Sequence, residues 1–172
     1  MKFENRAIFT AIISLIIFLC CSCSQSVPEC VTEYHKDMMI QWGNLDASNK
    51  YITAYKLDEF GNLYYVKNDT SKRSFVIEKI AEVDVEKFCG VFYFTNTVAM
   101  RTQALNAPGA QSRFIDFKIP ATRVFSRAVW NPVFQTVGSR QHRLLYDSLM
   151  TIVPKEHFMY DSLRLSSFEK QK

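Results

Sequence analysis

The sequence predicts an α+β domain: a mostly antiparallel sheet of about five strands, with two main helices packed on one face. Short runs with strand composition are joined to their neighbours by short turns, and segments with helical spacing separate these runs. The 172 residues are 48% hydrophobic and 14% aromatic, which supplies enough apolar side chain for one packed core. We therefore expect a single domain over residues 50–154, followed by a polar tail over residues 155–172.

The first segment with helical spacing begins just after Pro28, a residue that suits the start of a helix. Its larger side chains recur every three or four positions, which predicts a short helix. These side chains are Val31, Tyr34, His35, Met38 and Met39. A loop is expected over residues 43–50, where Gly, Asn, Asp and Ser are frequent.

Three strands are expected in the first half of the domain. Residues 51–57 and 63–66 are rich in aromatic and β-branched side chains. Between them, Gly61 and Asn62 tolerate the positive φ angles of a tight turn, so the two runs predict a hairpin. Residues 74–80 have the same composition and predict the third strand.

A helix is expected to begin near Asp84, whose side chain can cap the first turn. Four residues then form one apolar stripe, and Gly90 weakens the helix by about 1 kcal/mol relative to Ala. The stripe consists of Val85, Phe88, Cys89 and Phe92. Residues 106–109, with the pair Pro108 and Gly109, predict a turn after the helix.

Two further strands and a helix complete the prediction. Residues 113–119 alternate, so that Asp116 and Lys118 share one face of the strand. A turn at residues 120–122 leads to a returning strand over residues 123–130. Pro132 then ends this strand, because proline cannot donate a hydrogen bond to a sheet.

The last helix is expected to begin at Ser139, which can cap it, and to continue to about Ile152. Leu145, Leu149 and Ile152 lie on one side of this helix, and Pro154 closes it.

The N-terminal stretch has the pattern of an export signal. A thirteen-residue apolar run, residues 7–19, follows Lys2 and Arg6. It is shorter than the roughly 20 residues that a membrane-spanning helix needs. Cys20, Cys21 and Cys23 come directly after it. This arrangement resembles the lipobox of bacterial lipoproteins, in which a signal peptidase cuts before a lipid-modified cysteine.

The resemblance implies how the chain is processed and where it resides. Residues 1–22 would be the signal peptide, and residues 23–49 a tether that includes the short helix. Cys23, which follows the small residue Ser22, is the expected lipidation site, and Cys21 is the alternative. The chain would be anchored to a membrane of the bacterial cell envelope, facing the periplasm or the cell surface. Ordinary secretion and an uncleaved anchor are the competing interpretations.

In style the chain is also similar to short lipoproteins of Bacteroidota. Those bacteria O-glycosylate exported proteins at Asp followed by Ser or Thr and an aliphatic or small residue. The resemblance implies a candidate site at Ser162, within Asp161-Ser162-Leu163. Ser148 has the same context but lies in a predicted helix.

Positive charge is concentrated in the second half of the chain. Residues 91–155 contain eight Lys and Arg but only two Asp. Such an excess can mark a contact face for an anionic partner, whereas an ordinary solvated surface is the simpler interpretation and the one we favour. The candidate face comprises Arg113, Lys118, Arg123, Arg127, Arg140 and Arg143. In an exported protein the expected partners are an envelope protein, a glycan or an anionic lipid, and not nucleic acid.

Cysteines and aromatic residues offer further alternatives. With the signal removed and Cys23 lipidated, only Cys30 and Cys89 remain, and sequence does not decide whether they pair. We favour Cys89 as an unpaired, small buried residue. Five aromatic residues could form a sugar-stacking platform, although core packing is the simpler expectation. They are Tyr51, Tyr55, Tyr64, Tyr65 and Trp130.

No phosphate-binding loop, nucleophile elbow or zinc motif is present in the sequence. We therefore expect a lipid-anchored binding or structural module, without enzyme activity, cofactor or metal. The alternative is an envelope hydrolase whose site is assembled from distant residues, for example Cys89 with His142.

Overall fold

A computed structural model describes residues 26–48, 50–69, 74–134 and 136–158, and it has an α+β architecture. Two α-helices lie against a mixed sheet of seven strands. The elements are η1 (Glu33–His35), β1 (Met39–Asp46), β2 (Tyr51–Asp58), β3 (Asn62–Asp69), β4 (Ser74–Glu82), α2 (Val85–Arg101), β5 (Leu105–Ala107), β6 (Gln111–Ile119), η2 (Pro120–Thr122), β7 (Val124–Trp130), α3 (Arg140–Met150) and η3 (Lys155–His157).

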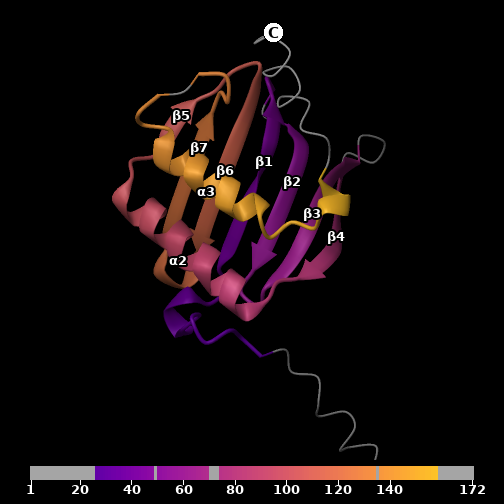
Figure 1. The fold of residues 1–172 in the computed structure, drawn as a ribbon, viewed down its shortest axis with the longest axis vertical. Coiled ribbons are helices and arrows are strands. Elements are labelled where there is room, and N and C mark those ends of the chain that lie inside the picture. Colours follow the sequence, from indigo (N-terminus) through magenta and orange to yellow (C-terminus); the bar gives the residue numbers. More distant parts are fainter. Residues whose placement is uncertain (1–25, 49, 70–73, 135, 159–172) are drawn as a thin grey trace, which may run out of the picture.

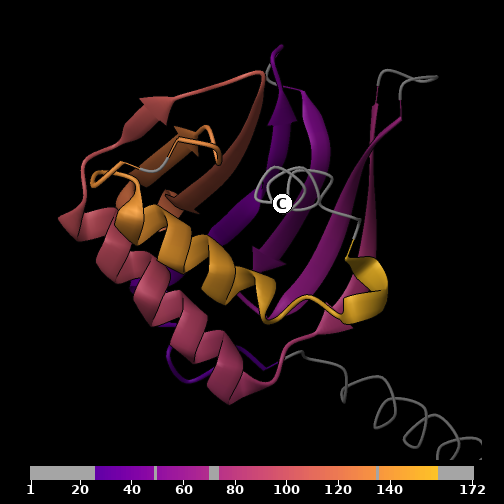
Figure 2. The same cartoon turned by 45° about the horizontal axis from the view of Figure 1, so that its top comes forward.

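The sheet has the strand order β4-β3-β2-β1-β6-β7-β5. All neighbouring strands are antiparallel except β5 and β7, which are parallel. Both α-helices cross the same face, α2 and α3 side by side, as Figures 1 and 2 show. The general class predicted from sequence is therefore confirmed. The predicted number of strands is too low, and the sheet is mixed.

The strand β1 is the main element that the sequence pattern did not predict. We expected a helix over the segment that includes Met39 and a loop from Gly43. Instead η1 is only one turn of 3-10 helix that ends at the C-cap residue Lys36 (φ −54°, ψ 138°), and Asp37 then adopts a left-handed conformation (φ 60°). The next residues pair with β2 on one side and β6 on the other. Pairing on both edges outweighs a weak helical pattern, and it places this segment at the centre of the sheet.

Gly43 allows β1 to occupy this central position. Its φ of 150° is unfavourable for other residues, and a Cβ atom there would lie 2.1 Å from the carbonyl oxygen of Thr53. Only glycine permits this close approach of β1 to β2. The pairing shifts register just beyond it, between Asn44 and Leu45.

The strand β5 corrects the prediction at the other end of the sheet. We expected a turn beginning at Asn106, but Leu105, Asn106 and Ala107 pair in parallel with Ala128, Val129 and Trp130 of β7. Three residues are too few for a period of two to be recognised in a sequence. The turn itself follows, where the Gly109 amide donates to Ser112 Oγ at 2.9 Å.

Both predicted helices are confirmed. The carboxylate of Asp84 accepts hydrogen bonds from the amides of Glu86 and Lys87, which are orphan donors of the first turn of α2. Ser139 precedes α3, but its hydroxyl donates to the carbonyl of Thr136 and does not cap the helix. Both helices bury one stripe of apolar residues against the sheet.

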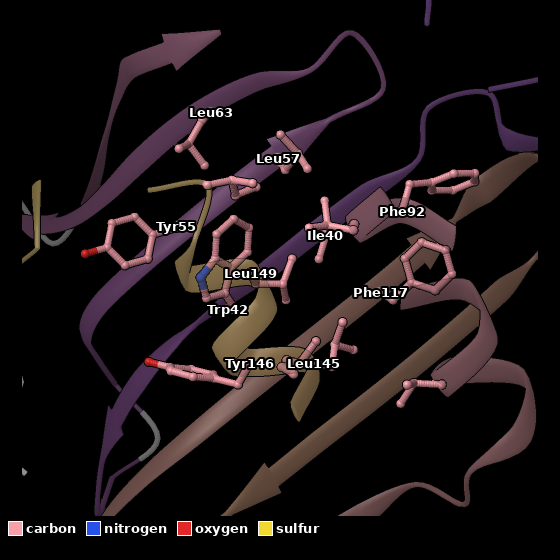
Figure 3. Packing of buried hydrophobic residues seen from close by; sticks show 14 of the residues in the cluster. Ile40, Trp42, Tyr55, Leu57, Leu63, Phe92, Phe117, Leu145, Tyr146 and Leu149 are labelled. Atoms are coloured by element: carbon pink, nitrogen blue, oxygen red, sulfur yellow. The ribbon is translucent and has the colours of Figure 1, made fainter. Parts of the chain in front are cut away.

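The main core lies between the helices and the sheet. Figure 3 shows Ile40 and Trp42 of the sheet among side chains of α3 that include Leu145 and Leu149. A second, smaller cluster spans five neighbouring strands: Leu45, Ala54, Val66, Phe114 and Val129. Pairing places Phe114 beside Gly43 and Val129, one position away from Ile115, which belongs to the main core. Because side chains alternate, the second cluster lies on the opposite face of the sheet.

Cys30 and Cys89 form a disulfide, with their Cα atoms 5.8 Å apart. Our expectation of an unpaired Cys89 is therefore wrong. The two residues are separated by 59 positions, and the segment ahead of β1 also contacts α2 where the ring of His35 lies 4.9 Å from that of Phe92, centre to centre. The bond ties the segment ahead of β1 to the first half of α2.

Candidate binding face

The sheet face opposite α2 and α3 carries a cross-strand row of polar side chains. Directly paired residues in neighbouring antiparallel strands share a face, so the register of the strand pairs defines this row. In strand order from β7 to β4 the row consists of Arg127, Asp116, Gln41, Lys56, Tyr64 and Lys79. We call these six residues, together with the adjacent Met39, Lys118 and Phe125, the helix-free face.

Asp116 is the most deeply buried charged residue of this face. Its side chain is 4% exposed, and one carboxylate oxygen accepts a hydrogen bond from Arg127 at 2.9 Å. The other oxygen, Oδ1, has no hydrogen-bond donor among the described residues. Burial raises the pKa of Asp116, while Arg127 and Lys118 act in the opposite direction. The ion pair is therefore incompletely satisfied and faces away from the helices.

Asp58, on the same side of the sheet, provides a contrast. Both of its oxygens accept hydrogen bonds within the β2–β3 turn, from the amides of Phe60 and Asn62, the Asn62 side chain and the Tyr64 hydroxyl, at 2.9–3.0 Å. Asp58 is thus explained by the turn that it stabilises. Asp116 is not part of a turn of this kind, and among the described residues only Arg127 donates a hydrogen bond to its carboxylate.

Positive side chains surround Asp116, and two of them lie against aromatic rings. Lys118 Nζ lies 5.5 Å from the centre of the Phe125 ring, and Lys56 Nζ lies 5.7 Å from that of Tyr64. Phe125 is 58% exposed. The face therefore combines cations, an accessible ring and one buried acceptor.

The six basic residues predicted as one contact face are divided by the fold. Lys118 and Arg127 lie together on the helix-free face. Arg113 lies on the other side, with its guanidinium 4.6 Å from the centre of the Tyr146 ring of α3. Arg140 and Arg143 belong to α3, and Arg123 is exposed at the η2–β7 junction.

Lys56, Lys79 and Gln41 were not among the predicted site residues. They lie in the first half of the chain, where acidic residues outnumber basic ones. A search for segments with excess positive charge therefore did not find them. Alternation could place Lys56 on one face of its strand. The register that aligns it with Gln41 and Asp116 is not readable from a single sequence.

Three aromatic residues of the candidate sugar platform are in the core, which agrees with the expectation that these residues serve in packing. Tyr55, Tyr65 and Trp130 are each at most 5% exposed. Tyr55 contacts Trp42 and Tyr65, with ring centres 5.7 Å apart in each case. Tyr64 alone among these residues with a described side chain belongs to the helix-free face.

Cys89 and His142, the example of a distant catalytic pair, do not form one. Cys89 is bonded to Cys30, so its thiol is not available as a nucleophile while the disulfide is intact. His142 is 3% exposed in α3, with its ring centre 6.3 Å from that of Trp130. Within the described ranges, no group of three or more His, Cys, Asp or Glu is arranged to hold a metal ion.

A hollow of about 360 Å³ lies between the β5–β6 turn and the β7–α3 loop. Its lining includes Pro108, Trp130 and Phe134, and none of the described residues that line it has an ionisable side chain. A second hollow of the same size lies between η1 and the β2–β3 turn, near Val31 and Phe60. Neither touches the row that contains Asp116.

The candidate lipidation sites Cys21 and Cys23 and the candidate glycosylation site Ser162 lie outside the described residues. In the part of the chain that the structure describes, no helix has the length and apolar character needed to cross a membrane.

Comparison of the chain with protein-family models, with curated proteins and with solved structures finds no match. The residues of the helix-free face and the N-terminal pattern therefore remain as the features that indicate a function.

Proposed function

We propose that this chain is a lipid-anchored binding module of the bacterial cell envelope, without catalytic activity, that captures an anionic partner on its helix-free face. The lipid on Cys23 would hold the protein at a membrane. The observation that carries the proposal is the presence of Lys56, Lys118 and Arg127 together on a sheet face that neither helix covers. Clustered cations on an accessible surface attract anionic partners.

The disulfide supports the export part of the proposal. Disulfides persist in oxidising compartments such as the periplasm and the cell surface, and are rare in the cytosol. The bond between Cys30 and Cys89 is therefore consistent with the signal-like N-terminal stretch. Its position close to Ser26, where the described chain begins, would also connect the tether firmly to the domain.

Charge reversal on the helix-free face tests the proposal. The double substitution Lys56→Glu, Lys118→Glu changes two half-buried side chains of the face without breaking the pair between Arg127 and Asp116. In cells, partners captured by crosslinking should be lost from this variant, and capture by the wild-type protein should weaken as salt rises.

The matched control is Lys87→Glu, Arg140→Glu, which reverses two exposed charges in the first turns of α2 and α3. Negative charge is favourable at these helix ends, so this variant should fold normally. It should capture partners as the wild-type protein does. Equal loss in both variants, or no loss in either, would contradict the proposed face.

A further inference from the structure

The incomplete satisfaction of Asp116 distinguishes this face from a simple cationic patch. A face built only to attract anions has no use for a buried carboxylate at its centre. Asp116 is 3% exposed, and its Oδ1 has no donor among the described residues, although Arg127 satisfies Oδ2. Buried polar atoms are usually paired, so an orphan acceptor on an outer face indicates a ligand that donates a hydrogen bond.

We propose that the helix-free face binds an acidic saccharide, with Asp116 Oδ1 accepting a hydrogen bond from a sugar hydroxyl while Arg127, Lys118 and Lys56 bind its acid groups. This proposal rests on the proposed function and specifies its ligand. Phe125 lies beside Lys118 on the same face and is 58% exposed, so its ring can pack against the apolar side of a pyranose.

The extent of the row favours a chain of sugars over a single small anion. Arg127, Asp116, Gln41 and Lys56 lie on four neighbouring strands, β7, β6, β1 and β2. Strands are about 4.8 Å apart, so the row spans about 14 Å. A single phosphate cannot contact both ends of such a row, whereas an oligosaccharide can.

The side chains around Oδ1 can move to admit a hydroxyl group. Gln41, Lys118 and Arg127 are all half-buried and long, with several rotatable bonds. Arg127 uses one terminal nitrogen on Asp116, and a guanidinium has five N–H donors in total. The same arginine can therefore hold Asp116 in place and contact an acid group of the ligand.

An anionic lipid surface fits this face less well. A phosphodiester carries no proton to donate at neutral pH, so a lipid could satisfy Asp116 only through a hydroxyl of its headgroup, with the phosphate held next to the carboxylate. The helix-free face also runs along the side of the molecule, whereas the described chain begins at one end of the strands (Figure 1). A membrane reached through that end would meet η1 and the β2–β3 turn first.

Asp116→Asn tests the proposal because the two interpretations of this residue predict opposite changes in affinity for a hydroxylated polyanion. If Asp116 only neutralises Arg127, removing its charge should strengthen binding of every polyanion. If Asp116 accepts a sugar hydroxyl, the amide should weaken binding of a hydroxylated polyanion by about tenfold, since hydrogen bonds to charged groups are the strong ones. The probes are an oligogalacturonate and a polyacrylate with the same number of carboxylates, which lacks hydroxyls.

The full-length protein, inserted in neutral phosphatidylcholine vesicles, is titrated with each probe. We expect the wild-type protein to prefer oligogalacturonate, and Asp116→Asn to lose that preference while binding polyacrylate as well or better. Asp147→Asn, an exposed change of the same charge on α3, should alter neither affinity. Phe125→Ala, which removes an exposed ring, should weaken the binding of oligogalacturonate but not that of polyacrylate. This variant provides a second test if Asp116→Asn folds poorly.

Several results would overturn the inference. Equal affinity of the wild-type protein for both probes, or stronger binding of both by Asp116→Asn, would show a cationic patch without saccharide recognition. Displacement of oligogalacturonate by phosphatidylglycerol vesicles at lower concentration than by free oligogalacturonate would indicate a lipid partner. In these cases Lys56→Glu, Lys118→Glu would still weaken binding. If that variant binds both probes as the wild-type protein does, the proposed function fails as well.

Discussion

Asp116 and Arg127 form an ion pair in which the two partners have unequal surroundings. The side chain of Asp116 is 4% exposed, and that of Arg127 is 40% exposed. Arginine can turn to solvent if it loses its partner, but the buried carboxylate cannot. The cost of breaking the pair should therefore depend on which residue is removed.

Arg127→Met should lower the free energy of unfolding by about 1–2 kcal/mol, because it leaves the charge of Asp116 buried without a partner. This is less than for a fully buried pair, because the guanidinium is partly solvated. Urea unfolding of the wild-type protein, both single variants and the double variant Asp116→Asn, Arg127→Met measures the coupling. The double variant should be more stable than Arg127→Met alone, and a double variant of equal or lower stability would contradict this account.

His142 provides a second residue-scale prediction, on pH. Burial lowers its pKa from the ordinary value of 6.5, and a hydrogen bond with the backbone of Gln103 acts in the opposite direction. As the pH falls below about 6.5, the unfolded chain takes up this proton first. Stability should therefore fall on acidification, with a slope from this group of at most about 1.4 kcal/mol per pH unit.

The variant His142→Gln isolates this contribution. Urea unfolding at several pH values between about 7 and about 5 should give a free energy of unfolding that depends less steeply on pH than in the wild-type protein, by at most roughly one proton's contribution. The other described histidines, His35 and His157, remain in both proteins and cancel in the comparison. Parallel curves for the two proteins would show that His142 does not titrate differently on unfolding.

At the scale of elements, the disulfide connects two segments that share no sheet pairing. The chain-entropy model assigns about 4 kcal/mol to a loop of this length, and strain or residual structure usually reduces that value. Cys30→Ala, Cys89→Ala should therefore lower the free energy of unfolding by about 2–4 kcal/mol. Urea unfolding under oxidising conditions measures the loss.

Reductant provides the control for this prediction. It should destabilise the wild-type protein and leave the double alanine variant unchanged. If thiol titration of the denatured, unreduced wild-type protein found both Cys30 and Cys89 free, the bond would be absent in solution.

Element by element, the prediction succeeded where local signals agree with tertiary packing. Asp84 begins α2 because its carboxylate caps orphan amides, a purely local effect. The alternation of residues 113–119 was readable because one face of β6 is in the main core. The prediction failed for β1, which has neighbours on both edges and apolar residues on both faces. Apolar and polar residues therefore do not alternate regularly along this strand.

At the scale of the whole molecule, the two sides of the sheet have different surroundings. The helices bury one side of the sheet, and the row that contains Asp116 lies on the other. The described chain begins at Ser26, three positions after Cys23, at one end of the strands. A lipid on Cys23 would leave the helix-free face accessible from beside the membrane.

The anchor is tested by intact mass. Protein extracted from membranes should begin at Cys23 and carry attached acyl groups. Cys23→Ser should release the protein from the membrane fraction, and Ser24→Ala is the matched control that should not. An unmodified chain, or one that begins at Cys21, would contradict lipidation at Cys23.

Local sequence patterns were enough to predict the α+β class, both α-helices and most of the strands, because capping, turns and side-chain periodicity act over a few residues. Tertiary structure alone decided the central position of β1, the pairing of Cys30 with Cys89 and the alignment of Asp116 with Gln41 and Lys56. These features join residues far apart in the chain. The distances between these residues in space are set by strand register and by packing across the sheet, and no local pattern in a single sequence encodes either of them.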